Sequence, residues 1–226
     1  MEPSERMMPV ASGVGEMPTT EPGEERAELG FVAAVQGSFG FLESDYRLRL
    51  VRAEPTFVRY EGERRFVNVF HGRASYELGV EIGRWVEVDD GFVEQRFALG
   101  YAVALGRDLE AVGFRAFTAT DAGAVARFVP QLAEWTREFV GPVIVADDDA
   151  AFERMSAGSA RDSQTYLQEG RASQLRKRAE TAWHDKDFDR VVLAYREIVD
   201  ELPLVQLQRS ELGRLHYAEG KLDEPS

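Results

Sequence analysis

The spacing of apolar residues changes along the chain and predicts a helix followed by a β-sheet. Apolar side chains recur every three or four positions over residues 29–39, which is the spacing of one helix face. Beyond Asp45, four short segments have the apolar pattern of strands, at residues 46–50, 56–60, 66–70 and 76–82. The segments between them are too short for a crossover connection, so an antiparallel four-stranded meander is predicted.

Helical spacing returns after Asp89-Asp90-Gly91 and predicts helices over residues 92–105 and 120–140. Three aspartates at 147–149 stand where the N-cap of a further helix is expected, and this role is favoured over metal chelation. Strands followed by helices indicate an α+β fold with helices on one face of the sheet. The chain is predicted to have three parts: a disordered acidic tail (1–26), an α+β domain (27–158) and a helical segment (159–226).

Two segments near the C-terminus resemble each other at an offset of 34 residues. The segment Lys186–Arg190 resembles Gly220–Glu224, and the same offset places Ala179 over Gly213. This offset is the period of the tetratricopeptide repeat. Residues 172–224 therefore resemble about one and a half such repeats.

The tetratricopeptide resemblance implies packing roles for six residues. The small residues Ala179 and Gly213 are expected where helices cross. Phe188, Leu222 and Tyr195 are expected to fill the groove between helices, and Pro203 to end the second helix. Arrays of this kind usually need about three repeats. The fragment is therefore expected to dock on the α+β domain, on an upstream helix at 162–176, or on a second subunit in a homo-oligomer.

The charge of the chain is strongly negative and unevenly distributed. The 27 basic and 40 acidic side chains give a net charge of −13, of which −4 lies in residues 1–26, −7 in 27–150 and −2 in 151–226. This balance argues against binding to nucleic acid or an anionic membrane, because both need a cationic surface. The basic cluster near the C-terminus is interpreted as a solvated helix face: Arg171, Arg176, Lys177 and Arg178.

Other composition features exclude further classes of protein. The chain has no cysteine, which excludes disulfide scaffolds, thiol catalysis and cysteine-ligated zinc. It has no apolar run long enough to span a membrane, and Glu2 and Glu5 replace the basic start of a signal peptide. A cytoplasmic location is expected.

Few residues indicate chemistry. His71 lies at a predicted strand end with Glu77 across the turn, so the two are either an acid–base pair or a turn histidine beside a surface carboxylate. Asp185–Asp189 begins like a calcium-binding loop, but Arg190 and Arg196 stand where that loop requires glycine and glutamate. No phosphate-binding, dinucleotide-binding or nucleophile motif occurs. Neither a metal nor a cofactor is expected.

Several segments of the predicted sheet together resemble a family of uncharacterised bacterial proteins: Phe41-Leu42, Val58–Glu61, Phe66–Arg73 and Ser75–Val80. The layout of the chain, a small acidic α+β domain, is similar to that of immunity proteins from polymorphic-toxin systems. This resemblance implies a non-catalytic protein that binds a basic protein partner through an acidic surface of the sheet domain. The expected contacts are Glu77, Glu81, Asp89, Asp90, Arg59 and His71.

Two alternatives stay open on the sequence. The C-terminal repeat could be the working part of an adaptor or oligomerisation protein, with the sheet domain as its cap. His71 and Glu77 could instead belong to a hydrolase.

Overall fold

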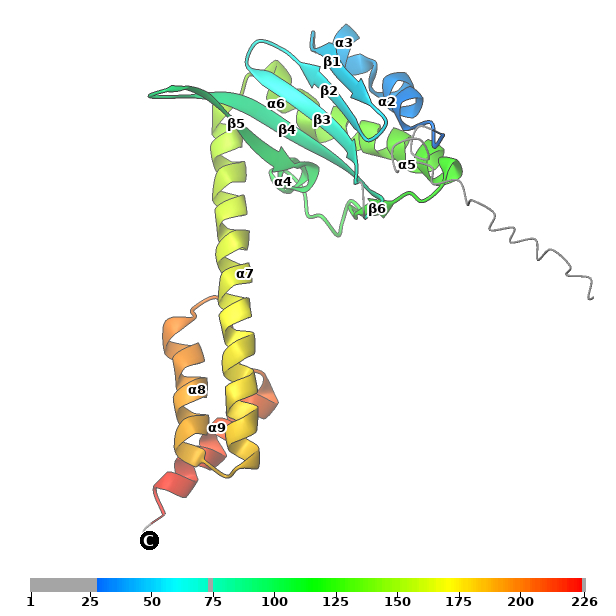
Figure 1. Cartoon of the computed structure of the whole chain (residues 1–226). Helices are drawn as coiled ribbons and strands as arrows, with labels where there is room; N and C mark the ends of the chain where they lie inside the picture. The colour runs from blue at the N-terminus through cyan, green and yellow to red at the C-terminus, as the bar shows by residue number, and fades with distance from the viewer. Residues whose placement is uncertain (1–27, 73–74, 225–226) are drawn as a thin grey trace, which may run out of the picture. The chain divides into compact units, whose positions relative to one another are not determined.

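The computed structural model describes residues 28–72 and 75–224 (Figure 1). The predicted disordered tail, residues 1–26, lies outside the described residues. The chain divides into two compact units, which we call the sheet unit (residues 1–93 and 115–137) and the helical unit (residues 94–114 and 138–226).

The sheet unit confirms the predicted α+β class and the predicted start with a helix. Helix α2 (Phe31–Phe39) and the short α3 (Phe41–Ser44) precede five consecutive strands. The strands are β1 (Arg49–Glu54), β2 (Phe57–Glu61), β3 (Arg65–His71), β4 (Glu77–Val88) and β5 (Gly91–Ala98). They are hydrogen-bonded in the order β1-β2-β3-β4-β5, and β6 (Phe117–Thr118) also pairs with β4. The four-stranded meander is thus part of a six-stranded antiparallel sheet.

The helix predicted over residues 92–105 is wrong in its first half. Residues 91–98 form β5, and only α4 (Leu99–Ala104) is helical. Asp89-Asp90-Gly91 acts as a hairpin turn, in which Gly91 has φ +132°, a conformation that side chains with a Cβ rarely adopt. Once the chain reverses there, residues of β5 hydrogen-bond to the outer side of β4 instead of to one another.

Helices α2 and α5 (Ala122–Trp135) pack against each other and against one face of the sheet (Figure 1). Asp121 caps α5, because its carboxylate accepts a hydrogen bond of 2.8 Å from the backbone N–H of Ala124. A π-helical turn at Thr136–Val140 follows α5. The sheet residues under these helices are fully or almost fully buried: Val58, Tyr60, Val67, Val69, Leu78, Val80 and Ile82.

The helical unit is built mainly from three long helices, α7 (Asp149–His184), α8 (Phe188–Glu201) and α9 (Arg209–Leu222). The separate helix expected at 162–176 is the middle of the single 36-residue helix α7, and the predicted domain boundary after residue 158 also falls inside it. Helix α8 packs against both α7 and α9. The shorter α6 (Gly141–Val145) precedes α7, and α4 packs against α7, where the Tyr101 hydroxyl donates to Asp162 at 2.9 Å. Among the described helices, none has both the length and the apolarity needed to cross a membrane.

Tyr60 gives the sheet unit a testable dependence on pH. Its side chain is fully buried, and its hydroxyl has no hydrogen-bond partner among the described residues. Burial, with a smaller contribution from the charge of Glu43, raises the pKa of Tyr60 from 10.0 to about 12. The unfolded chain therefore loses this proton first, so stability that is fully present below pH 10 is lost as the pH rises toward 12.

We expect Tyr60→Phe to remove this loss. At pH 7 the free energy of unfolding of the variant should equal that of the wild type or exceed it by about 1 kcal/mol, because the substitution removes a buried hydroxyl that has no described partner. Between pH 10 and 11 the wild type should lose up to about 1.4 kcal/mol more than the variant. Urea unfolding at both pH values measures the difference, and a variant that loses stability in parallel with the wild type would contradict this assignment.

Candidate functional site

The structure separates His71 from Glu77, the pair that the hydrolase alternative requires. His71 is opposite Leu78 in the β3–β4 register, so these two side chains share a face of the sheet. Glu77 directly precedes Leu78 in β4, so its side chain points to the other face, away from His71. His71 is buried, its ring stacks on Phe31 with centroids 5.7 Å apart, and Nε2–H donates to the carbonyl of Ala119 at 2.8 Å. Glu77 is exposed. His71 therefore supports the fold, and its place in the expected contact surface is wrong.

Arg59 and Glu81 lie in one row across the sheet, on the face opposite α2 and α5. The register places Arg59 opposite Asn68, and Asn68 opposite Glu81. Asn68 is fully buried, and its Nδ2 donates to Glu81 Oε2 at 3.0 Å. Arg59 donates from Nε to Glu61 at 2.9 Å, and its guanidinium stacks over the ring of Phe66 at 4.0 Å. Arg59 and Glu81 thus contribute to an internal layer of the unit, in which opposite charges are close together.

Two glycines of β4 make room for the aromatic part of this layer. Phe66 is opposite Gly83 and Phe70 is opposite Gly79. A Cβ added at either glycine would overlap the opposing ring. Phe66 is fully buried and lies beneath Arg59, so it has little space to move away. Gly79 and Gly83, which lie on the opposite face of β4 from the alternating Leu78, Val80 and Ile82, reflect this packing.

Gly83→Ala should therefore destabilise the protein by about 1–3 kcal/mol, the cost of overpacking a filled core. Gly37→Ala is the matched control, because Gly37 is exposed in α2 and an added Cβ there meets no atom within 4 Å. The control should be neutral or stabilising by up to about 1 kcal/mol. Urea unfolding of both variants measures the effect, and equal stabilities for the two would refute this packing.

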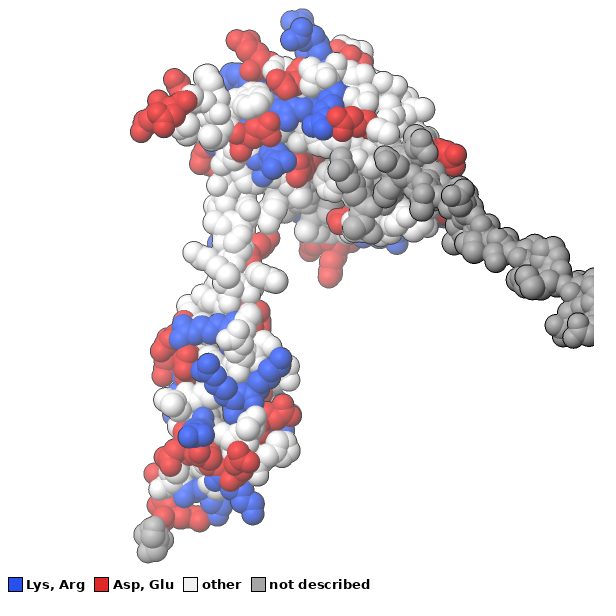
Figure 2. All heavy atoms as spheres, in the orientation of Figure 1, with Lys and Arg blue, Asp and Glu red and all other residues white. Residues whose placement is uncertain are grey.

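Asp89 and Asp90, the other expected contacts, lie at the tip of the β4–β5 hairpin. The last strand-to-strand contact of β3 is Arg65 with Arg84, so β4 extends beyond the end of β3. We call residues 87–93 the arm. All seven residues of the arm are exposed. The arm has three carboxylates, Glu87, Asp89 and Asp90, and no cation, and Figure 2 shows acidic side chains gathered at this end of the hairpin.

The arm also carries exposed apolar side chains. Val88, Phe92 and Val93 are 43%, 67% and 48% exposed. Large apolar groups are usually buried, and exposed ones that stand together are typical of interaction sites. Elsewhere over the strands of the sheet unit, acidic and basic side chains are interspersed in Figure 2. The arm therefore differs from the rest of the strand surface in having both one sign of charge and apolar side chains.

One aspartate of each cluster that was weighed as a metal site caps a helix. Asp148 accepts from the N–H of Ala151 at 3.0 Å at the start of α7, and Asp187 accepts from the N–H of Arg190 at 3.2 Å at the start of α8. These geometries confirm the capping interpretation. Within residues 28–72 and 75–224, no three side chains of a metal-ligating type lie close enough together to hold an ion.

Four of the six residues to which the repeat resemblance gave packing roles lie in or beside the core of the helical unit, and the repeat itself stays a prediction. Ala179 and Tyr195 are buried in the core of the helical unit, and Pro203 follows the end of α8. Phe188 joins an aromatic cluster in which its ring lies 6.1 Å from Trp183 and 5.8 Å from Tyr217. The packing roles of Gly213 and Leu222 need correction. Both are exposed on α9, and a Cβ added at Gly213 meets no atom within 4 Å, so none of the described helices crosses there.

The basic cluster seen in the sequence consists of two functionally different pairs. Arg171 bonds to Glu197 and Glu201 of α8, and these hydrogen bonds raise its pKa. Burial lowers the pKa of Arg176, but Glu169 and Glu211 raise it by more, and Arg176 Nε lies 2.9 Å from Glu211. These two arginines therefore hold helices together.

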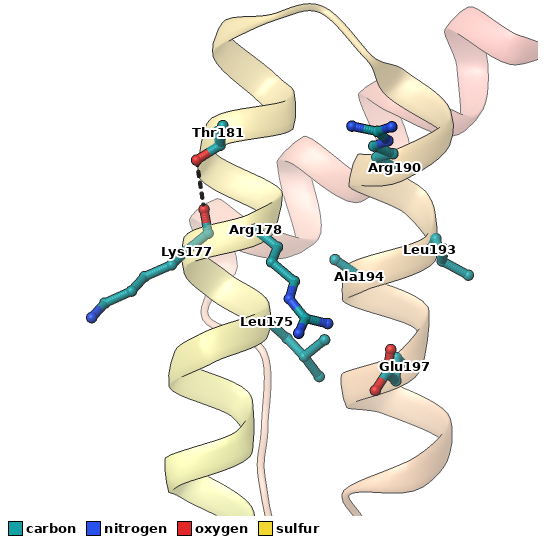
Figure 3. A pocket seen from close by; sticks show the side chains of 8 residues that line it. All are labelled: Leu175, Lys177, Arg178, Thr181, Arg190, Leu193, Ala194 and Glu197. Atoms are coloured by element: carbon teal, nitrogen blue, oxygen red, sulfur yellow. Dashed lines mark hydrogen bonds between the residues drawn. The ribbon is translucent and has the colours of Figure 1, made fainter.

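The second pair of the basic cluster, Lys177 and Arg178, lines a groove between α7 and α8 (Figure 3). The groove has a volume of about 520 Å³. Its other lining residues are Leu175, Thr181, Arg190, Leu193, Ala194 and Glu197. The groove could not be predicted from the sequence, because two helices contribute its residues and their packing had to be known first.

No family model matches the chain, and no curated protein or solved structure matches it either. The resemblances drawn from the sequence to an uncharacterised bacterial family and to immunity proteins therefore stay predictions. The arm and the groove are the two candidate interaction sites among the described residues.

Proposed function

We propose that the protein is a non-catalytic protein-binding module that holds a basic protein partner through the arm. The single observation that carries the proposal is the combination of exposed apolar side chains with carboxylates on a hairpin that extends past the neighbouring strand. Apolar contact supplies most of the binding free energy in such interfaces, and the charge selects the partner and speeds its encounter. Asp89 and Asp90 are the charged contacts, and Phe92 is the apolar anchor.

The placement of the other candidate residues supports this choice. Glu81 and Arg59 take part in the packed face of the sheet, and His71 lies on the opposite face from Glu77. A hydrolase that used His71 and Glu77 would need both side chains to reach one substrate, but they lie on opposite faces of the sheet and His71 is buried. An immunity-like role for the module is consistent with an acidic surface that binds a basic toxin domain.

The C-terminal helices support a second part of the proposal, that the helical unit contains about one and a half tetratricopeptide-like repeats. Ala179 is buried where helices approach each other, Tyr195 is buried in the core, and Pro203 follows α8. In this proposal, helix α9 is the first helix of a second repeat. Its exposed Gly213 and Leu222 are the positions that a following helix would cover in a longer array.

The arm predicts a specific loss of binding. The first partner to test is the product of the neighbouring gene, with the full-length protein as bait. Asp89→Asn with Asp90→Asn should weaken binding about tenfold at moderate salt, and Phe92→Ser should weaken it to a similar degree. Titration calorimetry at two salt concentrations measures both effects, and binding to the wild type should weaken as salt rises.

A charge-matched control separates the arm from the net charge. Glu28→Gln with Glu134→Gln removes the same two charges from exposed positions of the sheet unit outside the arm and should leave binding unchanged. Equal losses for the two double variants would mean that the arm has no special role. A partner that is acidic or neutral, bound without salt dependence, would count against the proposed function.

A further inference from the structure

The α7–α8 groove has a local charge opposite to that of the chain. Three cations line it, Lys177, Arg178 and Arg190, against one anion, Glu197, in a protein with a net charge of −13. Glu197 is engaged by Arg171, whose Nη2 lies 2.6 Å from its carboxylate, so it is less able to neutralise the groove. The electrostatic character of the groove is therefore basic.

The cations of the groove are available to a ligand to different degrees. Neither Lys177 nor Arg178 forms an ion pair with a described residue. Arg190 pairs with Asp187 at 3.2 Å, but its side chain is 80% exposed, and such exposed pairs are weak. Figure 3 shows the Arg178 guanidinium in the space between α7 and α8, near Leu175, whereas Lys177 points away from α8. Arg178 and Arg190 are thus the cations that face the groove from its two helices.

Apolar side chains form the rest of the lining. Leu175 and Ala194 are buried in the core of the helical unit, and Leu193 is 68% exposed at the wall of the groove. A volume of about 520 Å³ lies within the range of sites that enclose a ligand or part of a peptide, about 300–1,000 Å³. Two packed helices also present ridges and grooves that a third helix can fit.

We propose that the α7–α8 groove binds an acidic amphipathic helix of a partner protein. Apolar side chains of that helix cover Leu193 and fill the groove, and its flanking carboxylates pair with Arg178 and Arg190. A second copy of the same groove is a poor occupant, because it would place cations against cations. This inference goes beyond the proposed function, since the arm selects a basic partner and the groove selects an acidic one.

The test uses a synthetic helical peptide as the probe for the groove. The peptide has about 14 residues, four helical turns, with leucines along one face and glutamates beside them. Fluorescence anisotropy with the full-length protein should detect binding that weakens between about 50 and 300 mM salt. A second peptide with glutamine in place of every glutamate should bind at least about tenfold more weakly, and a third with serine in place of leucine should not bind.

Protein variants then locate the peptide. Arg178→Glu with Arg190→Glu should weaken binding of the glutamate peptide about tenfold or more. Arg161→Glu, a charge reversal at an exposed position of α7 outside the groove, should have little effect. The peptide comparison uses the wild-type protein alone, so the test does not depend on the variants folding.

Several outcomes would overturn the inference. These are no binding of the glutamate peptide, equal binding of the glutamine peptide, or equal loss with Arg161→Glu. If millimolar inorganic phosphate displaced the glutamate peptide, and the serine peptide bound as tightly as the leucine peptide, the groove would be a simple anion site instead. If light scattering showed the wild-type protein to be a dimer and the Leu193→Glu variant to be a monomer, the groove would bind a second copy of the chain instead. Asp89→Asn with Asp90→Asn should leave peptide binding intact, which separates failure of this inference from failure of the proposed function.

Discussion

The burial of β3 on both of its faces is the constraint on which the sheet unit depends. Val67 and Val69 face the helices, and Phe66 and Asn68 are also fully buried on the other face. An antiparallel sheet with helices on one side usually leaves its other side to water. Here Phe66 lies on Gly83 beneath the guanidinium of Arg59, and this layer of side chains takes the place of a second layer of helices. Such a face is already occupied by its own contacts, and this is why the proposed partner site is the arm.

The parts of the fold that could be predicted are those in which hydrophobicity and burial agree. The alternation from Leu78 to Ile82 predicted a strand with one buried face, and the structure has it in β4. The strand β5 was missed because the spacing of apolar residues from Phe92 onward predicted a helix, whereas Phe92 and Val93 are exposed and mark no buried face. Sequence patterns assume that apolar residues are buried, and this assumption fails where apolar side chains stand exposed, as they do in the arm.

The helical unit was predictable in its short-range features and not in its long-range ones. The N-caps Asp148 and Asp187 and the buried Ala179 follow from local rules of helix formation. The unbroken length of α7 does not, because its middle is polar and contains Gly158 and Gly170, which weaken a helical pattern. The roles of the four clustered cations depend on which helix each one faces: Arg171 pairs with carboxylates of α8, and Arg176 pairs with Glu211 of α9. Only the packing of α7, α8 and α9 determines these partners.

The carboxylates of the arm have a consequence for solubility. Strand β5 ends the sheet, and a sheet edge with exposed apolar side chains is a template on which other chains can add strands. Glu87, Asp89 and Asp90 place like charges at the point where two such edges would meet, and the repulsion opposes self-association. The charges that are proposed to attract one partner would thus also protect the exposed edge from aggregation while that partner is absent.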